Sequence, residues 1–187
     1  MEAIFNSFLI VALGEMGDKT QLLAFVLATR FKKPWAVLAG IFVATVANHL
    51  LAATAGQWIS AHLPPQYLKI GLAVTFFAFA IWILVPDKID DDVKTYKFGA
   101  FLTTVVVFFL AEMGDKTQLA TVALAARFQS VVLVTVGTTV GMMLTDGLAV
   151  FFGEKVAARI SMTWMHRIAA VLFVICGVLA LTSMPSS

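Results

Sequence analysis

The sequence has little charge and a single cysteine. Only 13% of its 187 residues are charged and 60% are apolar, whereas soluble domains carry about 25% charged and about 45–50% apolar residues. This composition argues against a soluble enzyme, and it excludes a disordered chain, which would be rich in charge. The lone Cys176 excludes an intrachain disulfide, and a net charge of +2 gives no reason to expect a nucleic-acid partner. The class that remains is an integral membrane protein, whose first partner is the lipid bilayer.

Long apolar segments are what the sequence has in place of charge. A membrane-spanning helix needs about 20 mostly apolar residues, and six segments meet this requirement. They lie at approximately 3–29, 35–59, 66–86, 98–126, 130–153 and 164–183. The 87–97 segment mixes four aspartates with three lysines and is expected to be a solvated linker. The sequence therefore predicts an all-α integral membrane protein with six transmembrane helices.

The basic residues outside these segments are unevenly distributed. Nine lie in the loops that join the first segment to the second, the third to the fourth and the fifth to the sixth. The opposite side has only Lys69 and Arg127. Because cytoplasmic loops are rich in Lys and Arg, this bias places the 87–97 linker in the cytoplasm and both termini on the outer side.

The chain also contains an internal repeat. Residues 14–31 and 111–128 are identical at 12 of 18 aligned positions, at a constant offset of 97 residues. The repeated stretch opens each half of the chain, and each half includes three predicted helices. Because three is an odd number, the second half must cross the membrane in the opposite orientation. We therefore expect two inverted three-helix repeats, residues 1–86 and 98–187. Such repeats are typical of transporters, which bind their cargo between the repeats near the middle of the membrane.

Four carboxylates lie in the middle of predicted transmembrane helices. Glu15 and Asp18 belong to the first helix, and Glu112 and Asp115 to the fourth. Their spacing of three residues predicts that each pair shares one helix face. A charged residue at the centre of a bilayer costs about 2.5–3.5 kcal/mol, so such residues indicate a function by default. We interpret the four carboxylates as a site for a metal cation.

Threonine and glutamine follow each acidic pair in both copies. If the two motifs meet, these residues would support an all-oxygen site, which suits Mn²⁺, Ca²⁺ or Mg²⁺ better than Zn²⁺ or Cu⁺. The supporting residues are Thr20, Gln21, Thr117 and Gln118. Met16 and Met113 could add a thioether ligand that favours Mn²⁺, although packing against lipid or a neighbouring helix explains them more simply.

Lysines follow the two glutamates at four residues' distance, within reach of an ion pair. A second interpretation of the motifs is thus two internal pairs, Glu15–Lys19 and Glu112–Lys116, that only neutralise each other. This interpretation accounts for the lysines, but it leaves both motif aspartates unpaired. The cation site is therefore the favoured interpretation.

Two further titratable residues occupy equivalent positions of the two repeats. The offset of 97 residues aligns His49 with Asp146, and Asn48 with Thr145. His49 and Asp146 could carry protons or support the lysines of the motifs, with Asn48 beside them. For His49, a packing role with a satisfied hydrogen bond is an equally good interpretation.

The motif E-M-G-D-K-T at residues 15–20 and again at residues 112–117 resembles the signature of the GDT1 family, which includes bacterial manganese exporters. The resemblance covers essentially the whole chain. It implies secondary transport of Mn²⁺ and Ca²⁺, thought to be in exchange for protons, with the motif Glu and Asp residues forming the cation path. The short linker resembles that of bacterial members, which implies export of Mn²⁺ across a bacterial inner membrane.

The resulting hypothesis is a transporter, not an enzyme, that exports a divalent cation in exchange for protons, with Na⁺ as the other candidate coupling ion. An empty site would hold several carboxylates close together, so protons and metal would compete for it. The metal is cargo, and no cofactor is expected. Because one chain carries both motifs, a monomer is sufficient.

Three alternatives belong to other functional classes. A small exporter of cationic organic solutes could use the same acids, although the motif offers little to hold an organic skeleton. A cation channel could use a ring of carboxylates without coupling. An intramembrane aspartyl protease is disfavoured, because Met16 and Met113 occupy the place of the first glycine in its signature.

Overall fold

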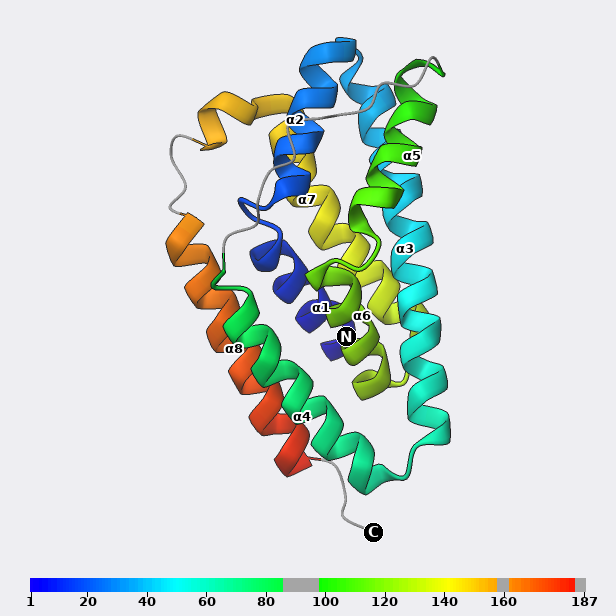
Figure 1. Cartoon of the computed structure of the whole chain (residues 1–187), viewed down its shortest axis with the longest axis vertical. Coiled ribbons are helices and arrows are strands. Elements are labelled where there is room, and N and C mark those ends of the chain that lie inside the picture. The colour runs from blue at the N-terminus through cyan, green and yellow to red at the C-terminus, as the bar shows by residue number, and fades with distance from the viewer. Residues whose placement is uncertain (86–97, 158–161, 184–187) are drawn as a thin grey trace.

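The computed structural model describes residues 1–85, 98–157 and 162–183, and the regular structure in these ranges is entirely α-helical. The predicted 87–97 linker and the basic residues Lys88, Lys94, Lys97 and Arg159 lie outside the described residues. The described residues form eight helices (Figure 1). These are α1 (Glu2–Gly14), α2 (Lys19–Phe31), α3 (Pro34–His62), α4 (Pro65–Trp82), α5 (Gly99–Glu112), α6 (Lys116–Phe128), α7 (Val131–Ala157) and α8 (Met162–Ser183).

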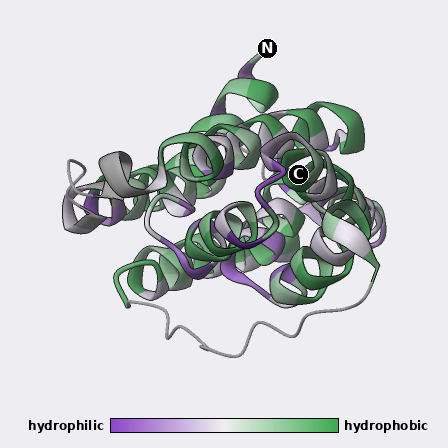
Figure 2. Ribbon diagram, turned by 90° about the horizontal axis from the view of Figure 1, so that it is seen from above, coloured by the Kyte–Doolittle hydropathy of each residue, from purple (hydrophilic) through white to green (hydrophobic). Residues whose placement is uncertain are grey.

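Apolar residues predominate along most of these helices (Figure 2). In the described chain, α3, α4 and the Val131–Gly153 part of α7 are long and apolar enough to cross a membrane. Helices α1 and α5 and the His166–Thr182 part of α8 are apolar but shorter. Large apolar side chains such as Trp35, Ile81 and Val132 are exposed on the surface, as lipid-facing side chains would be.

The predicted segments 3–29 and 98–126 are each two helices rather than one. Helix α1 ends at Gly14 before α2 begins at Lys19, and α5 ends at Glu112 before α6 begins at Lys116. Within the breaks, Gly17 and Gly114 have φ of 87° and 79°. This left-handed conformation suits glycine, which has no Cβ, and interrupts a right-handed helix.

The breaks overturn one expectation from the sequence. Asp18 and Asp115 have extended backbone, with ψ of 170° and 167°, and stand immediately before α2 and α6. The preceding helix has ended by then, α1 at Gly14 and α5 at Glu112. The prediction that Glu and Asp of each motif share one helix face is therefore wrong, since no continuous helix joins them.

Helix α7 packs against α1 and α2, and α3 packs against α5 and α6, while α4 and α8 lie side by side (Figure 1). Two glycines bring backbones close together in these interfaces. A Cβ on Gly40 of α3 would meet Thr104 and the Phe101 carbonyl of α5, and one on Gly137 of α7 would meet Ser7 and the Ile4 carbonyl of α1. Small residues commonly permit such close helix contacts in membranes.

The same local features recur 97 residues apart. The left-handed residues Lys32 and Gln129, with φ of 53° and 50°, follow α2 and α6. The glycine breaks, the extended aspartates and the close contacts of Gly40 and Gly137 recur at the same offset. Similar sequence thus gives similar local structure in the two halves of the chain.

Candidate metal centre

The two helix breaks bring three buried carboxylates together. One carboxylate oxygen from each of Glu15, Glu112 and Asp115 lies within 4.8 Å of the others. Glu15 follows the last residue of α1, Glu112 ends α5 and Asp115 precedes α6. All three residues are at most 5% exposed. The two motifs thus meet at these residues.

Each of the three carboxylates has one oxygen held by a neighbour. Thr20 Oγ1 donates a hydrogen bond to Glu15 Oε2 at 2.7 Å, and Thr117 Oγ1 donates to Glu112 Oε2 at 3.4 Å. The Lys19 ammonium lies 3.1 Å from Asp115 Oδ1. These contacts orient the carboxylates and leave the second oxygen of each available.

The second oxygens have no hydrogen-bond partner among the described residues. Glu15 Oε1, Glu112 Oε1 and Asp115 Oδ2 are all buried in this way. Leaving a buried anionic oxygen unpaired costs several kcal/mol, and like charges so close together repel each other. A bound cation or protons would relieve both costs, and an all-oxygen donor set suits a hard divalent cation.

Helix ends of both polarities meet at the site. The carbonyl ends of α1 and α5 lead directly to Glu15 and Glu112, while α2 and α6 begin directly after Asp18 and Asp115. Helix C-termini and N-termini carry half-charges of opposite sign, so these largely offset one another and the carboxylates supply the attraction for a cation. Broken helices that present their ends to the cargo are a recurring feature of secondary transporters.

The motif glutamines form hydrogen bonds with the backbone of the two helix breaks. Gln21 Oε1 accepts a hydrogen bond from the Gly17 N–H at 2.9 Å, and its Nε2 donates to the Thr145 carbonyl of α7 at 3.2 Å. Gln118 Oε1 accepts from the Gly114 N–H at 2.6 Å. The glutamines thereby position the breaks, and their predicted support of the metal stays a prediction.

The second glutamine is also connected to α3. Gln118 Nε2 lies 3.4 Å from Asn48 Oδ1, and Asn48 Nδ2 donates to the Phe109 carbonyl of α5 at 3.0 Å. Asn48 and Thr145 are 97 residues apart, as are the two glutamines. The links from Gln118 to α3 and from Gln21 to α7 are therefore equivalent, and both connect a break to a long helix.

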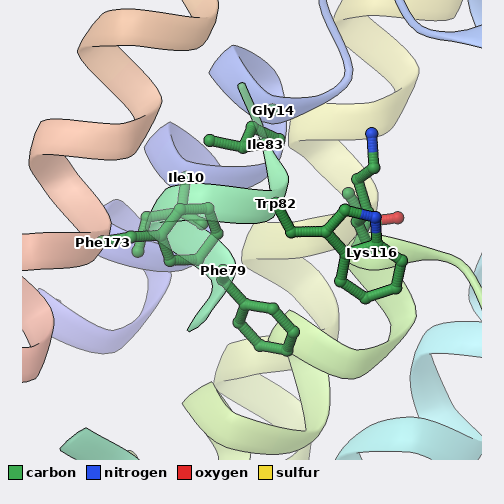
Figure 3. Close-up of a pocket in the computed structure, with 8 residues that line it drawn as sticks. Ile10, Gly14, Phe79, Trp82, Ile83, Lys116 and Phe173 are labelled. Atoms are coloured by element: carbon green, nitrogen blue, oxygen red, sulfur yellow. The ribbon is translucent and has the colours of Figure 1, made fainter. Parts of the chain in front are cut away.

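The lysines have unequal surroundings. Lys19 pairs with Asp115 of the other motif, so Asp115 has a cationic neighbour. Lys116 Nζ donates to the Val85 carbonyl at 3.1 Å, beyond the end of α4. The Lys116 side chain lies among apolar residues, with Phe79 and Trp82 close by (Figure 3).

The remaining acidic and methionine residues of the motifs are not part of the group of three carboxylates. Asp18 is 5% exposed and precedes α2, outside the group of three close oxygens. Met113 is 57% exposed, which fits a lipid-facing or helix-facing side chain better than a ligand of a buried metal. Met16 is half-buried. Whether Asp18 takes part in metal binding stays a prediction.

His49 and Asp146 are fully buried on α3 and α7. Among the described residues, neither ring nitrogen of His49 and neither carboxylate oxygen of Asp146 has a hydrogen-bond partner. The predicted packing role of His49 with a satisfied hydrogen bond therefore has no support in the described chain. A role for both residues in carrying protons stays a prediction.

Sequence reasoning did not single out several buried hydroxyls. Within the described ranges, Ser7, Thr45, Thr135 and Thr139 have buried side-chain oxygens without a hydrogen-bond partner. In the sequence, each of these residues is a single polar residue within an apolar helix. Such residues are common in membrane proteins, because their hydroxyls usually bond the helix backbone, so they do not indicate a functional site by themselves.

The chain matches one protein family and several of its relatives. The family model described as "Divalent cation/proton antiporter GDT1" matches residues 3–91 and 100–187. A putative manganese exporter of Vibrio cholerae is 42% identical over 176 residues, which cover 94% of this chain and 88% of that protein. GDT1-like protein 3 of Arabidopsis thaliana is 26% identical over 92% of this chain and 68% of its own length. No solved structure matches the chain.

Proposed function

Because this chain belongs to the GDT1 family of divalent cation/proton antiporters, we propose that it exports Mn²⁺ from the cytoplasm of a bacterial cell in exchange for protons. The family is one of membrane transporters, and the metal is therefore cargo rather than a cofactor. Ca²⁺ is the second candidate cargo. The observation that carries the proposal is the group of three buried carboxylates, each with an oxygen that no described residue pairs.

The proposed architecture is two inverted repeats, residues 1–86 and 98–187, that together make six membrane crossings. In this arrangement α1 with α2, and α5 with α6, each form one broken crossing. The recurrence of breaks, caps and close contacts at an offset of 97 residues supports it. The family model also matches one stretch in each half of the chain. Glu15 then comes from one repeat, and Glu112 and Asp115 from the other.

This arrangement suggests how exchange works. Metal and protons compete for the same carboxylates, so the site holds one or the other. If the repeats rock against each other about the site, it faces the two sides of the membrane in turn. Protons that enter from outside down their gradient would then displace Mn²⁺ that has bound from the cytoplasm.

Proteoliposomes test the coupling. We expect an imposed pH gradient to drive Mn²⁺ uphill, and an imposed Mn²⁺ gradient to move protons in the opposite direction. Radioactive Mn²⁺ and an internal pH dye would measure both fluxes in the same vesicles. Mn²⁺ flux without any proton movement would contradict proton exchange. It would indicate Na⁺ coupling if it required Na⁺, and a channel if it required no counter-ion.

The orientation is a separate prediction. The bias of basic residues places both termini on the outer side of the membrane. Alkaline phosphatase fused after Ser187 should therefore be active in living bacteria, while green fluorescent protein at the same place should be dark. A bright fluorescent fusion with an inactive phosphatase fusion would reverse the proposed orientation.

The three close oxygens favour an ion over an organic cargo. Within 4.8 Å of one another, they fit around one small cation at the usual metal–oxygen distances of about 2.0–2.6 Å. An organic ammonium also needs apolar surface for its carbon skeleton. A wild-type protein that moved basic amino acids but not Mn²⁺ in the same vesicles would favour the organic-cation alternative.

A further inference from the structure

Lys19 and Lys116 occupy equivalent positions of the repeated motif but have different surroundings. The Lys19 side chain is 33% exposed, and its ammonium lies 3.1 Å from Asp115 Oδ1, on a side chain that is only 4% exposed. Lys19 therefore reaches from an accessible position into the buried group. Lys116 is 7% exposed and donates to the Val85 carbonyl. It lines a pocket together with Phe79 and Trp82 of α4 and Phe173 of α8 (Figure 3).

The Lys19 ammonium already occupies part of the space around a proposed metal ligand. Asp115 Oδ1 faces Lys19, and Asp115 Oδ2 belongs to the same carboxylate. A divalent cation bound to this carboxylate would lie about 2.0–2.6 Å from its oxygen, and so within a few ångströms of the ammonium. Two cations at that separation in a buried site repel each other strongly.

We propose that Lys19 is a tethered counter-cation, which neutralises Asp115 while the site is free of metal and is displaced when Mn²⁺ binds. The proposal rests on the proposed function of the carboxylate group. The exposure of the Lys19 side chain gives its ammonium an accessible place to move to. Lys116 is confined by its backbone contact and apolar neighbours, so only one of the two equivalent lysines acts in this way.

Displacement has two consequences for transport. Mn²⁺ that binds the second oxygen of Asp115 repels the Lys19 ammonium from the first, so the lysine lowers the affinity for metal. The metal-free carrier, in turn, keeps Lys19 on Asp115 while protons occupy the two glutamates, so it can change conformation without leaving any of the three carboxylates uncompensated in the membrane. Lys19 therefore acts on the metal-free part of the cycle rather than on the metal-loaded part.

The test is the affinity for Mn²⁺, measured by titration calorimetry on purified protein. Lys19→Met should bind Mn²⁺ about tenfold more tightly than the wild type, because the competing cation is gone. Lys19→Arg keeps the charge and should bind like the wild type. Lys116→Met should show no such tightening, and Lys69→Met, at the far end of α4, controls for the loss of a lysine.

A transport measurement tests the second consequence. In proteoliposomes, Lys19→Met should keep the exchange of Mn²⁺ for Mn²⁺, which needs only the loaded carrier. Net Mn²⁺ export should fall, because it needs the metal-free carrier to return. A lysine that only stabilised the fold would lower both rates together.

Three results separate the possible failures. Weaker or unchanged Mn²⁺ binding by Lys19→Met, with normal binding by the wild type, overturns the role of Lys19 alone. Absence of Mn²⁺ binding by the wild type overturns the proposed function itself. If Lys19→Met unfolds when Mn²⁺ is removed by a chelator while Lys19→Arg stays folded, the result supports the proposal, because Asp115 has then lost both the metal and the ammonium that replaces it.

Discussion

Replacing Glu15 with glutamine is expected to reduce Mn²⁺ transport by at least about 100-fold, a loss of about 2.7 kcal/mol in transition-state stabilisation. Glutamine has the same shape and can still accept the hydrogen bond that Thr20 donates to Glu15 Oε2. It lacks the negative charge, however, and its amide group would place hydrogen-bond donors where the unpaired Oε1 now lies. Uptake of radioactive Mn²⁺ into proteoliposomes measures the effect.

Glu2→Gln is the matched control for this variant. Glu2 begins the same helix, α1, and is exposed, so the same change of side chain removes a charge far from the site. We expect wild-type transport from Glu2→Gln. Transport by Glu15→Gln at a rate close to that of the control would remove Glu15 from the cation path. Equal protein levels and elution volumes in the two preparations would exclude a folding defect.

The second large effect concerns the fold, and comes from Gly56→Leu. Gly56 of α3 packs directly on α6, and a Cβ there would overlap the Val122 carbonyl and touch the Ala125 Cβ. A backbone carbonyl inside a helix cannot move aside as a flexible side chain can. Leucine at this position should therefore destabilise the protein by about 3 kcal/mol or more, or prevent assembly altogether.

Gly71→Leu provides the comparison, because a Cβ on Gly71 of α4 would meet nothing within 4 Å. Leucine also favours helix more than glycine does, so Gly71→Leu should unfold at the wild-type temperature or slightly above it. Thermal unfolding in detergent, followed by tryptophan fluorescence, distinguishes the two variants. If Gly56→Leu were as stable as Gly71→Leu, α3 and α6 could not pack as the structure has them.

Much of the site could be predicted from the sequence, because its chemistry is concentrated in a repeated motif. Glu15, Glu112 and Asp115 were each identifiable as charged residues in apolar segments, and all three lie in the buried group. The offset of 97 residues aligned the two motifs, and the breaks within them have similar φ at Gly17 and Gly114.

The helix breaks could not be predicted from hydropathy. Composition stays apolar across residues 3–29 and 98–126, and a break of a few residues does not change it. A glycine weakens a helix, but its presence in each motif does not reveal that the backbone turns to positive φ there. Because the break sets the direction of each aspartate, the expected common face of Glu and Asp failed with it.

The partner of Lys19 could not be predicted either. Spacing along one helix pointed to Glu15, whereas the ammonium lies beside Asp115 of the other motif. That contact depends on how the two breaks face each other, which is a property of tertiary packing. The unequal surroundings of Lys19 and Lys116 are likewise invisible in two motifs of identical sequence.

The location of bound Mn²⁺ tests the central claim most directly. Crystals grown with Mn²⁺, measured at a wavelength where manganese scatters anomalously, would show the metal without assumptions about the protein. We predict one strong peak between Glu15, Glu112 and Asp115, which disappears in the Glu15→Gln variant. A peak elsewhere, for example at the acidic 87–97 linker, with none between the three carboxylates, would contradict the account.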